Sequence, residues 1–346
     1  MSICAPVRVT GFRHRVADHA ASGALRDLLE HHRFSYAPEP LSEGAVFGLS
    51  GALDLRVRIT PNGVPVLDLE GRSASLEGEL CGHLGLRGDL CRTDDPDTGW
   101  QLLRAHLDAG HPALVRADLS ELDYRDGTRH DTRHAVVVSG YDIDTDVAWI
   151  ADGTFPEPQR CSLPALARAR ASDWGAEPVR HALLRLRPSA KLADPRDAVT
   201  AALRRSVRHM RGASSGPVYP YVHTGLAGAD ALADAWPMLP ELAGPRLGET
   251  LAGLRFRVRH AGTGGALYRS LQARFLHDAA ALLGSPQLGQ AALICDDLSD
   301  AWRALAGATE GEDAGRAHQV ASPWLQRVRT LERRHTEALE AHLDAR

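Results

Sequence analysis

Residues 133–153, with the sequence RHAVVVSGYDIDTDVAWIADG, constrain the fold more than any other stretch. Two runs rich in β-branched, aromatic and small apolar residues, 135–140 and 147–151, flank the turn-rich segment YDIDTD, and this pattern predicts a β-hairpin. A turn in the middle of that segment pairs positions whose numbers sum to about 287. The numbers of His134 and Asp152 sum to 286, which is within one of that value. We therefore expect their side chains to lie side by side at the open end of the hairpin.

A histidine held by a carboxylate is a candidate general base. The carboxylate fixes the tautomer of the imidazole and makes it a better base. The same pairing is also common between neighbouring strands on protein surfaces, where it does no chemistry. Catalysis needs, in addition, a nucleophile from another part of the fold. The N-terminus of a helix is a good source, because its dipole and free N–H groups stabilise both a thiolate and an oxyanion.

Such a helix is predicted directly after His19, over residues 20–32, with Asp18 as the expected N-cap. The apolar residues at helical spacing are Ala21, Ala24, Leu25, Leu28 and Leu29. A nucleophile at the start of a helix, followed far downstream by a strand histidine and a strand aspartate, is the papain-like order. Here the first helical position is Ala20, whose methyl group cannot attack a substrate.

The rest of the N-terminal half mixes strands and helices. Residues 44–59, GAVFGLSGALDLRVRI, predict a glycine-punctuated loop followed by a strand. The pattern also predicts a short helix over 99–110 and strands over 111–119 and 179–187. These short alternating elements favour a sheet-bearing domain with helices.

Prolines and polar residues at 188–197 interrupt this pattern, and five segments with helical periodicity follow. The predicted fold class is therefore α+β, with domains at 1–187 and 198–346. Trp302 and Trp324, which lie within helical patterns, are expected in the core.

The charge balance excludes some functions. The 346 residues carry a net charge of −4, so no broad basic face is expected, and neither nucleic acid nor a membrane surface is an expected partner. No window approaches the roughly 20 apolar residues of a membrane helix, and the N-terminus lacks the pattern of a secretory signal. Five scattered cysteines favour a reducing cytoplasm over a disulfide framework.

No metal site is expected from the sequence. His130 and His134 are four residues apart, but on a strand such residues lie about 13 Å apart. Cys81 and Cys91 have no matching second pair, so they do not indicate structural zinc. His31 and His32 are expected to be the polar end of the first helix. The glycines of GTGGA at 262–266 predict a tight helix entry rather than a phosphate loop.

Four stretches in order resemble the butirosin biosynthesis protein H family. HAASGAL at 19–25 resembles the family's His-Cys-x-Ser-x-Ala-Leu opening, and LSEGAVFGLSGAL at 41–53 resembles its Ser-Glu and Phe-Gly-Leu-Gly stretch. HAVVVSGYD at 134–142 resembles the family's hairpin, with Asp152 closing the next strand. GTGGALYRSLQARFLHDAA at 262–280 resembles its Gly-Thr-Gly-Gly helix. The resemblance covers nearly the full length.

The resemblance implies a papain-like, cysteine-protease-type N-terminal domain followed by a mostly α-helical C-terminal domain. It implies transfer of an acyl group from the thioester of an acyl or peptidyl carrier protein to a small-molecule amine, or a related cyclisation. The donor is then the phosphopantetheine arm of the carrier, and no other cofactor is expected. A homodimer is compatible with this reading. The Arg-rich helix face at 203–211 is expected either in solvent or against an acidic carrier-protein helix.

The resemblance also implies site roles. Position 20 attacks the thioester, His134 acts as base and then as acid, and Asp152 orients His134. The backbone N–H groups near position 20 hold the oxyanion. His19, Ser22, Ser42 and Glu43 are expected near the substrate, without a definite role for the last two.

Two departures from the family pattern leave alternatives open. Ala20 stands where the family has its cysteine, and the residues after Gly48 differ from the family's Gly- and aromatic-rich continuation, so the substrate pocket is expected to differ. Either the cysteine has been replaced deliberately, or the chain is a natural homologue that binds without turnover or uses His134 and Asp152 as a general base without a covalent intermediate. Another nucleophile is the weakest option, because Ser22 lies about 200° around the helix from position 20 and Cys4 is on an untethered terminus. A peptidase or amidohydrolase on the same scaffold is a further alternative.

Overall fold

The structure is a computed structural model, and it describes residues 5–73, 76–125, 129–175, 177–186, 191–213 and 221–345. The chain divides into two compact units, which are described separately. The first unit comprises Met1–Glu43 and Gly85–Leu192, and the second comprises Gly44–Leu84 and Ala193–Arg346. An N-terminal part with a sheet and a helical C-terminal part confirm the predicted α+β class. No helix in the described ranges has the length and apolar character needed to cross a membrane.

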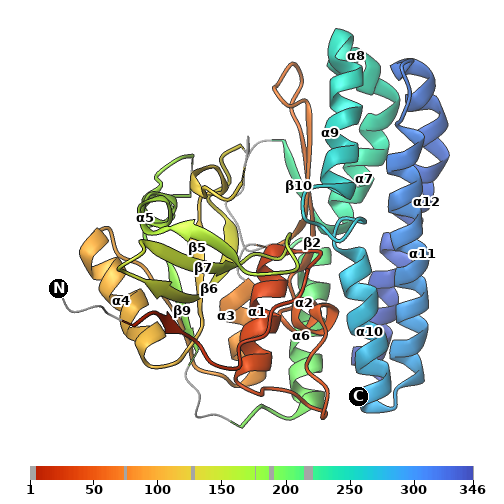
Figure 1. The fold of residues 1–346 in the computed structure, drawn as a ribbon. Coiled ribbons are helices and arrows are strands. Elements are labelled where there is room, and N and C mark those ends of the chain that lie inside the picture. Colours follow the sequence, from red (N-terminus) through yellow and green to blue (C-terminus); the bar gives the residue numbers. More distant parts are fainter. Residues whose placement is uncertain are drawn as a thin grey trace. The chain divides into compact units, whose positions relative to one another are not determined.

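The first unit is built on one antiparallel sheet. Its elements in chain order are β1 (Val7–Arg8), α1 (Ala20–His31), β4 (Gly88–Cys91), α4 (Pro96–Asp108), β5 (Ala113–Ala117), the 3₁₀ helix η1 (Leu119–Glu121), β6 (His134–Asp142), β7 (Val147–Ala151), β8 (Gln159–Ser162), α5 (Leu163–Ala171) and β9 (Leu183–Leu186). The strand order is β4-β9-β5-β6-β7-β8, and β1 pairs with the end of β6. Side chains from β5, β6 and β7 form a core with apolar residues of α4 and α5, which lie on one side of the sheet (Figure 1), and α1 packs against β5 and β6.

The predicted hairpin is confirmed as β6 and β7. Its register differs slightly from the expected one, because the paired positions sum to 288 or 289, as in Val137 with Ala151 and Asp142 with Val147. The turn is longer than expected, and the ladder is irregular at Ser139. If this register is continued by one residue, Asp152 lies opposite Val136. His134 is then the diagonal neighbour of Asp152 on the same face of the sheet. The two side chains still meet.

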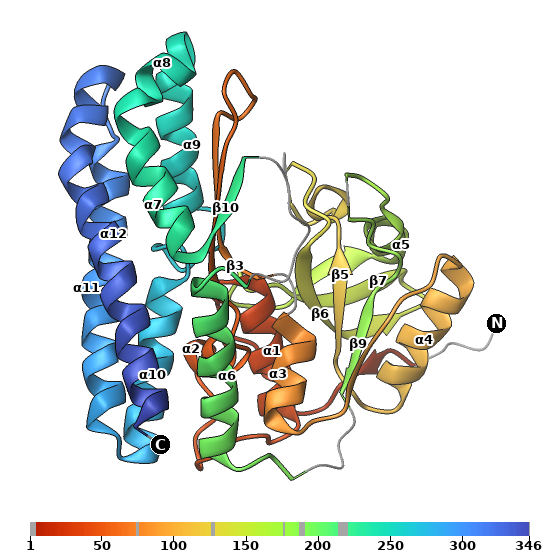
Figure 2. The same ribbon diagram turned by 180° about the vertical axis from the view of Figure 1, so that it is seen from behind.

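The second unit combines a small sheet with a helical bundle. Its elements are α2 (Glu43–Leu49, of which Glu43 groups with the first unit), β2 (Leu53–Ile59), β3 (Leu67–Arg72), α3 (Leu76–Leu84), α6 (Pro195–Met210), β10 (Val222–Thr224), α7 (Gly225–Ala235), the 3₁₀ helix η2 (Trp236–Met238), α8 (Leu239–Ala243), the 3₁₀ helix η3 (Gly244–Arg246), α9 (Leu247–Arg259), α10 (Arg269–Leu283), α11 (Pro286–Ala308) and α12 (Ala314–Asp344). The long helices α11 and α12 run side by side (Figure 2).

Residues 44–84, which the sequence assigns to the N-terminal domain, pack within the second unit. The physical reason is strand pairing: β2 lies between β3 and β10, and β10 comes from the C-terminal half of the chain. The boundary expected at 188–197 adjoins the division after Leu192, although residues 187–190 lie outside the described ranges.

Two further expectations in this unit are wrong. Residues 44–49 form helix α2 rather than a loop. Gly48 allows α2 to pack closely against α10, because a Cβ atom at this position would lie 1.9 Å from Cγ of Phe275. Trp302 is fully buried as expected, but Trp324 is 39% exposed. The helix entry predicted for GTGGA is present, with left-handed backbone at Gly264, Gly265 and the residues just before α10.

Candidate active site

His134 and Asp152 form the ion pair that the hairpin predicts. The Nε2 atom of His134 lies 3.1 Å from Oδ2 of Asp152, and Asp152 is completely buried. Burial by itself raises the pKa of this carboxyl, but the hydrogen bond and charge of His134 and the charge of Arg125 together hold it well below its usual range. Asp152 is therefore a fixed anion at neutral pH.

Two residues that the sequence analysis did not single out also hold Asp152. The Arg125 guanidinium donates to both carboxylate oxygens, at 2.9 to 3.0 Å, and the hydroxyl of Tyr124 donates to Oδ2 at 3.0 Å. The backbone N–H of Thr154 donates to Oδ1 at 3.1 Å. With so many donors, Asp152 cannot rotate freely, and its charge is shared between Arg125 and His134.

This arrangement fixes the tautomer of His134. A carboxylate only accepts hydrogen bonds, so Nε2 of His134 carries the proton that faces Asp152. The other ring nitrogen, Nδ1, makes no hydrogen bond with any residue that the structure describes. In the neutral ring Nδ1 holds the lone pair, and it is the atom that can accept a proton from a reacting group.

The N-terminus of α1 carries position 20. Ala20 is the first helical residue, and the N-cap is His19 rather than the expected Asp18. The side chain of His19 caps the helix, because its Nδ1 accepts from the backbone N–H of Ser22 at 3.3 Å and lies 2.7 Å from the Ser22 hydroxyl. Ser22 is fully buried. His19 and Ser22 thus order the start of the helix.

Glu43 also braces this N-terminus. Its carboxylate accepts from the backbone N–H of His19 at 2.8 Å and from that of Asp18 at 3.1 Å. Burial is the largest influence on Glu43 and raises its pKa, against these two hydrogen bonds. Ser42 precedes it at the surface of the same segment and is half-buried. The expected role of these two residues beside the substrate stays a prediction.

The first turn of α1 has free backbone amides and is tied to the end of the hairpin. The N–H groups of Ala20 and Ala21 make no hydrogen bond within the described ranges, as is usual at a helix start. The chain just before the helix is tied to the end of β7, since Ala17 N–H donates to the carbonyl oxygen of Gly153 at 2.8 Å. Gly153 directly follows Asp152, so the start of α1 is anchored at the end of the hairpin that carries the ion pair.

A second tie comes from His14, which the sequence analysis missed. Its Nδ1 lies 2.7 Å from Oδ2 of Asp27 in α1, and its Nε2 lies 3.2 Å from the Asp152 carbonyl oxygen and 3.0 Å from that of Phe155. Burial lowers the pKa of His14, but the Asp27 carboxylate and the two carbonyls outweigh it, and the pKa is raised. His14 therefore links α1 to the backbone of Asp152. No short motif in the sequence signals this link.

His130 and His134 do not face a common ion. His130 lies 2.8 Å from Oδ2 of Asp118 and 2.7 Å from the Ser120 hydroxyl, and its ring stacks on Trp174. The two histidines thus have separate carboxylate partners. Because the pair of His130 and Asp118 resembles the pair of His134 and Asp152, a substitution of His130 serves as a control for a substitution of His134.

Two family models match the chain. Residues 19–153 match the model described as butirosin biosynthesis protein H, N-terminal, and residues 164–339, just over half of the chain, match a domain of unknown function, DUF4872. The first match begins at His19 and ends at Gly153, so it spans position 20, His134 and Asp152. A search of the curated proteins found no match.

Proposed function

We propose that this chain, which belongs to the DUF4872 family and carries a butirosin biosynthesis protein H N-terminal domain, transfers an acyl group from a thioester to an amine in natural-product biosynthesis. The observation that carries the proposal is the ion pair between His134 and Asp152, held inside the matched domain and anchored to the N-terminus of α1. A base fixed in one tautomer beside a helix N-terminus is what acyl transfer requires.

In the covalent form of the reaction, a thiol stands at position 20. The thiolate forms a bond to the thioester carbonyl carbon, the bond from that carbon to the donor sulfur breaks, and the donor thiol leaves with the proton that His134 had taken. The amine then attacks the acyl-enzyme, and His134 returns the amine proton to the sulfur at position 20. The first-turn amides of α1 are the proposed donors to the oxyanion in both steps.

The chain as it stands cannot form this intermediate, because Ala20 has no nucleophilic atom. This observation favours a second route with the same overall reaction. The amine attacks the donor thioester directly, Nδ1 of His134 takes the proton from the amine nitrogen, and the departing donor sulfur receives that proton. The donor is proposed to be the phosphopantetheine arm of a carrier protein, and the acceptor a small amine.

The first test introduces a thiol at position 20. An Ala20→Cys protein mixed with an acyl-pantetheine thioester is expected to gain the mass of one acyl group, and peptide mapping is expected to place it at position 20. The unsubstituted chain, with all its native cysteines, is the matched control and is expected to gain none. Addition of a primary amine is expected to discharge the adduct as an amide.

Three results of this experiment count against the proposal. Absence of an adduct with every acyl chain tried argues against thioester processing at this site. An adduct of equal amount on the unsubstituted chain shows that another cysteine reacts. Release of free acid in the presence of excess amine favours a hydrolase on the same scaffold.

A further inference from the structure

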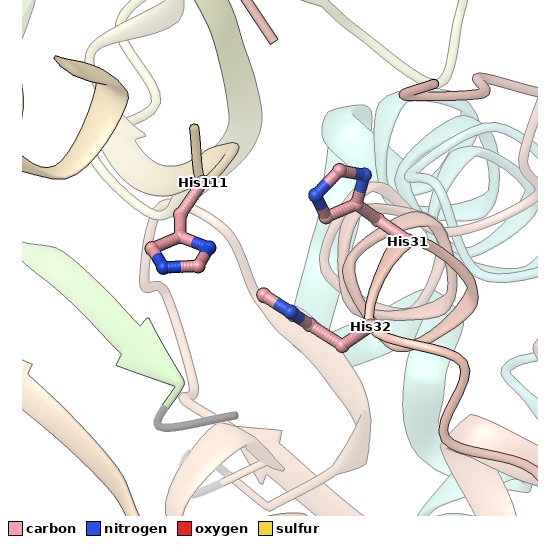
Figure 3. A group of neighbouring side chains, drawn as sticks. All are labelled: His31, His32 and His111. Atoms are coloured by element: carbon pink, nitrogen blue, oxygen red, sulfur yellow. The ribbon is translucent and has the colours of Figure 1, made fainter. Parts of the chain in front are cut away.

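Three histidines gather at the far end of α1 from position 20. His31 is the last residue of that helix, His32 is its C-cap, and His111 lies between α4 and β5. One ring nitrogen from each lies within 4.8 Å of the others, and all three residues are half-buried. Figure 3 shows the His111 ring opposite the rings of His31 and His32. The cluster brings together segments that are about 80 positions apart in the chain.

The three rings pack directly against one another. The His32 ring centroid lies 5.1 Å from that of His31 and 5.4 Å from that of His111, and the His106 ring packs beside His111 at 5.4 Å between centroids.

One nitrogen in the cluster is buried without a partner. Nε2 of His32 is shielded from solvent and makes no hydrogen bond with the described residues. Leaving a polar atom in this state costs free energy unless something satisfies it.

We propose that His31, His32 and His111 bind one divalent late-transition metal ion, Zn²⁺, through three imidazole nitrogens. In a tetrahedral site with Zn–N bonds of about 2.0–2.1 Å the ligand nitrogens lie about 3.4 Å apart, so small rotations of the rings bring them to that spacing. The C-terminus of a helix also favours a cation through its dipole. Water completes the coordination.

The site is separate from the proposed active site. Position 20 and His31 are eleven residue steps apart along the helix, a rise of about 17 Å. The ion would join the end of α1 to the segment that leads into β5 and would act on the stability of the first unit. It takes no part in the proposed acyl transfer, so a result that refutes one of the two proposals leaves the other untouched.

The test is zinc binding by the full chain after treatment with a chelator, measured by calorimetry against a competing chelator. The unsubstituted chain is expected to bind one Zn²⁺. His111→Ala is expected to weaken binding by at least about 100-fold, the upper end of what loss of a hydrogen bond to a metal-ligating histidine costs. His277→Ala is the matched control, since His277 is exposed and bonded to Asp296 in the second unit, and it is expected to bind like the unsubstituted chain.

Two more measurements distinguish the loss of a zinc ligand from a loss of zinc binding that is caused by unfolding of the variant. Zn²⁺ is expected to raise the thermal midpoint of the unsubstituted chain and of His277→Ala, and to leave that of a folded His111→Ala or His32→Gln variant unchanged. X-ray absorption of the zinc complex is expected to show nitrogen and oxygen neighbours at about 2.0 Å and no sulfur. Equal affinity in a variant that lacks all three histidines, a sulfur neighbour, or no binding by the unsubstituted chain would overturn the proposal.

Discussion

Replacement of His134 by glutamine in an Ala20→Cys protein is expected to slow acylation of the introduced thiol by about 10²- to 10⁴-fold. The imidazole has two tasks in the proposed reaction. It draws the proton from the thiol, and it gives a proton to the departing donor sulfur. Glutamine has a similar size and can still donate to Asp152, so the hairpin is expected to keep its structure while the proton-transfer group is lost.

The matched control for this experiment is His130→Gln in the same background. His130 also pairs with a buried aspartate, Asp118, at 2.8 Å, but it lies outside the proposed site. Its replacement is expected to leave the acylation rate within about twofold, as is usual for a change away from the reacting groups. Stopped-flow release of the donor thiol gives both rates. A similar slowing in both variants, or none in His134→Gln, contradicts the assigned role.

The largest expected change in stability lies in the second unit. Arg269 and Glu332 form an ion pair with both side chains completely buried, and the Arg269 Nε lies 2.9 Å from Glu332 Oε1. The Trp302 indole N–H donates to the same oxygen at 2.8 Å, and Arg269 also donates to the Leu267 carbonyl. Glu332→Ala leaves the guanidinium buried without its counter-charge, and we expect it to lower the free energy of unfolding by about 3–5 kcal/mol.

Glu340→Ala is the matched control on the same helix. Glu340 pairs with Arg211 at the surface, and its removal is expected to cost no more than about 1 kcal/mol. Urea unfolding followed by circular dichroism compares the two variants directly. Equal shifts of the unfolding midpoint would show that the buried pair contributes no more than a surface pair.

The central pair of the site could be predicted from sequence because a hairpin is local. Strand propensities and a turn signal place His134 near Asp152 within 20 residues of chain. The longer turn and the irregularity at Ser139 shift the register from the expected one, and the pair survives because diagonal neighbours on one face are still within reach of each other. The start of α1 at position 20 is equally local.

The groups that brace the site could not be predicted in this way. Arg125, Tyr124 and His14 reach Asp152 or its backbone through tertiary contacts, and none of them belongs to a motif with a fixed spacing. The histidine cluster is also a product of the fold. His31 and His32 indicate only the polar end of a helix until the chain brings His111 beside them.

Position 20 is proposed to face His134, and the most direct test of this arrangement is the pH dependence of alkylation of an Ala20→Cys protein by iodoacetamide. A thiol paired with a histidine and placed at a helix N-terminus reacts as a thiolate far below the pKa of a free thiol, which is about 8.5. We expect a midpoint at or below about pH 7.5 that moves up when His134→Gln is added. A midpoint near 8.5 that His134→Gln leaves unchanged would contradict it.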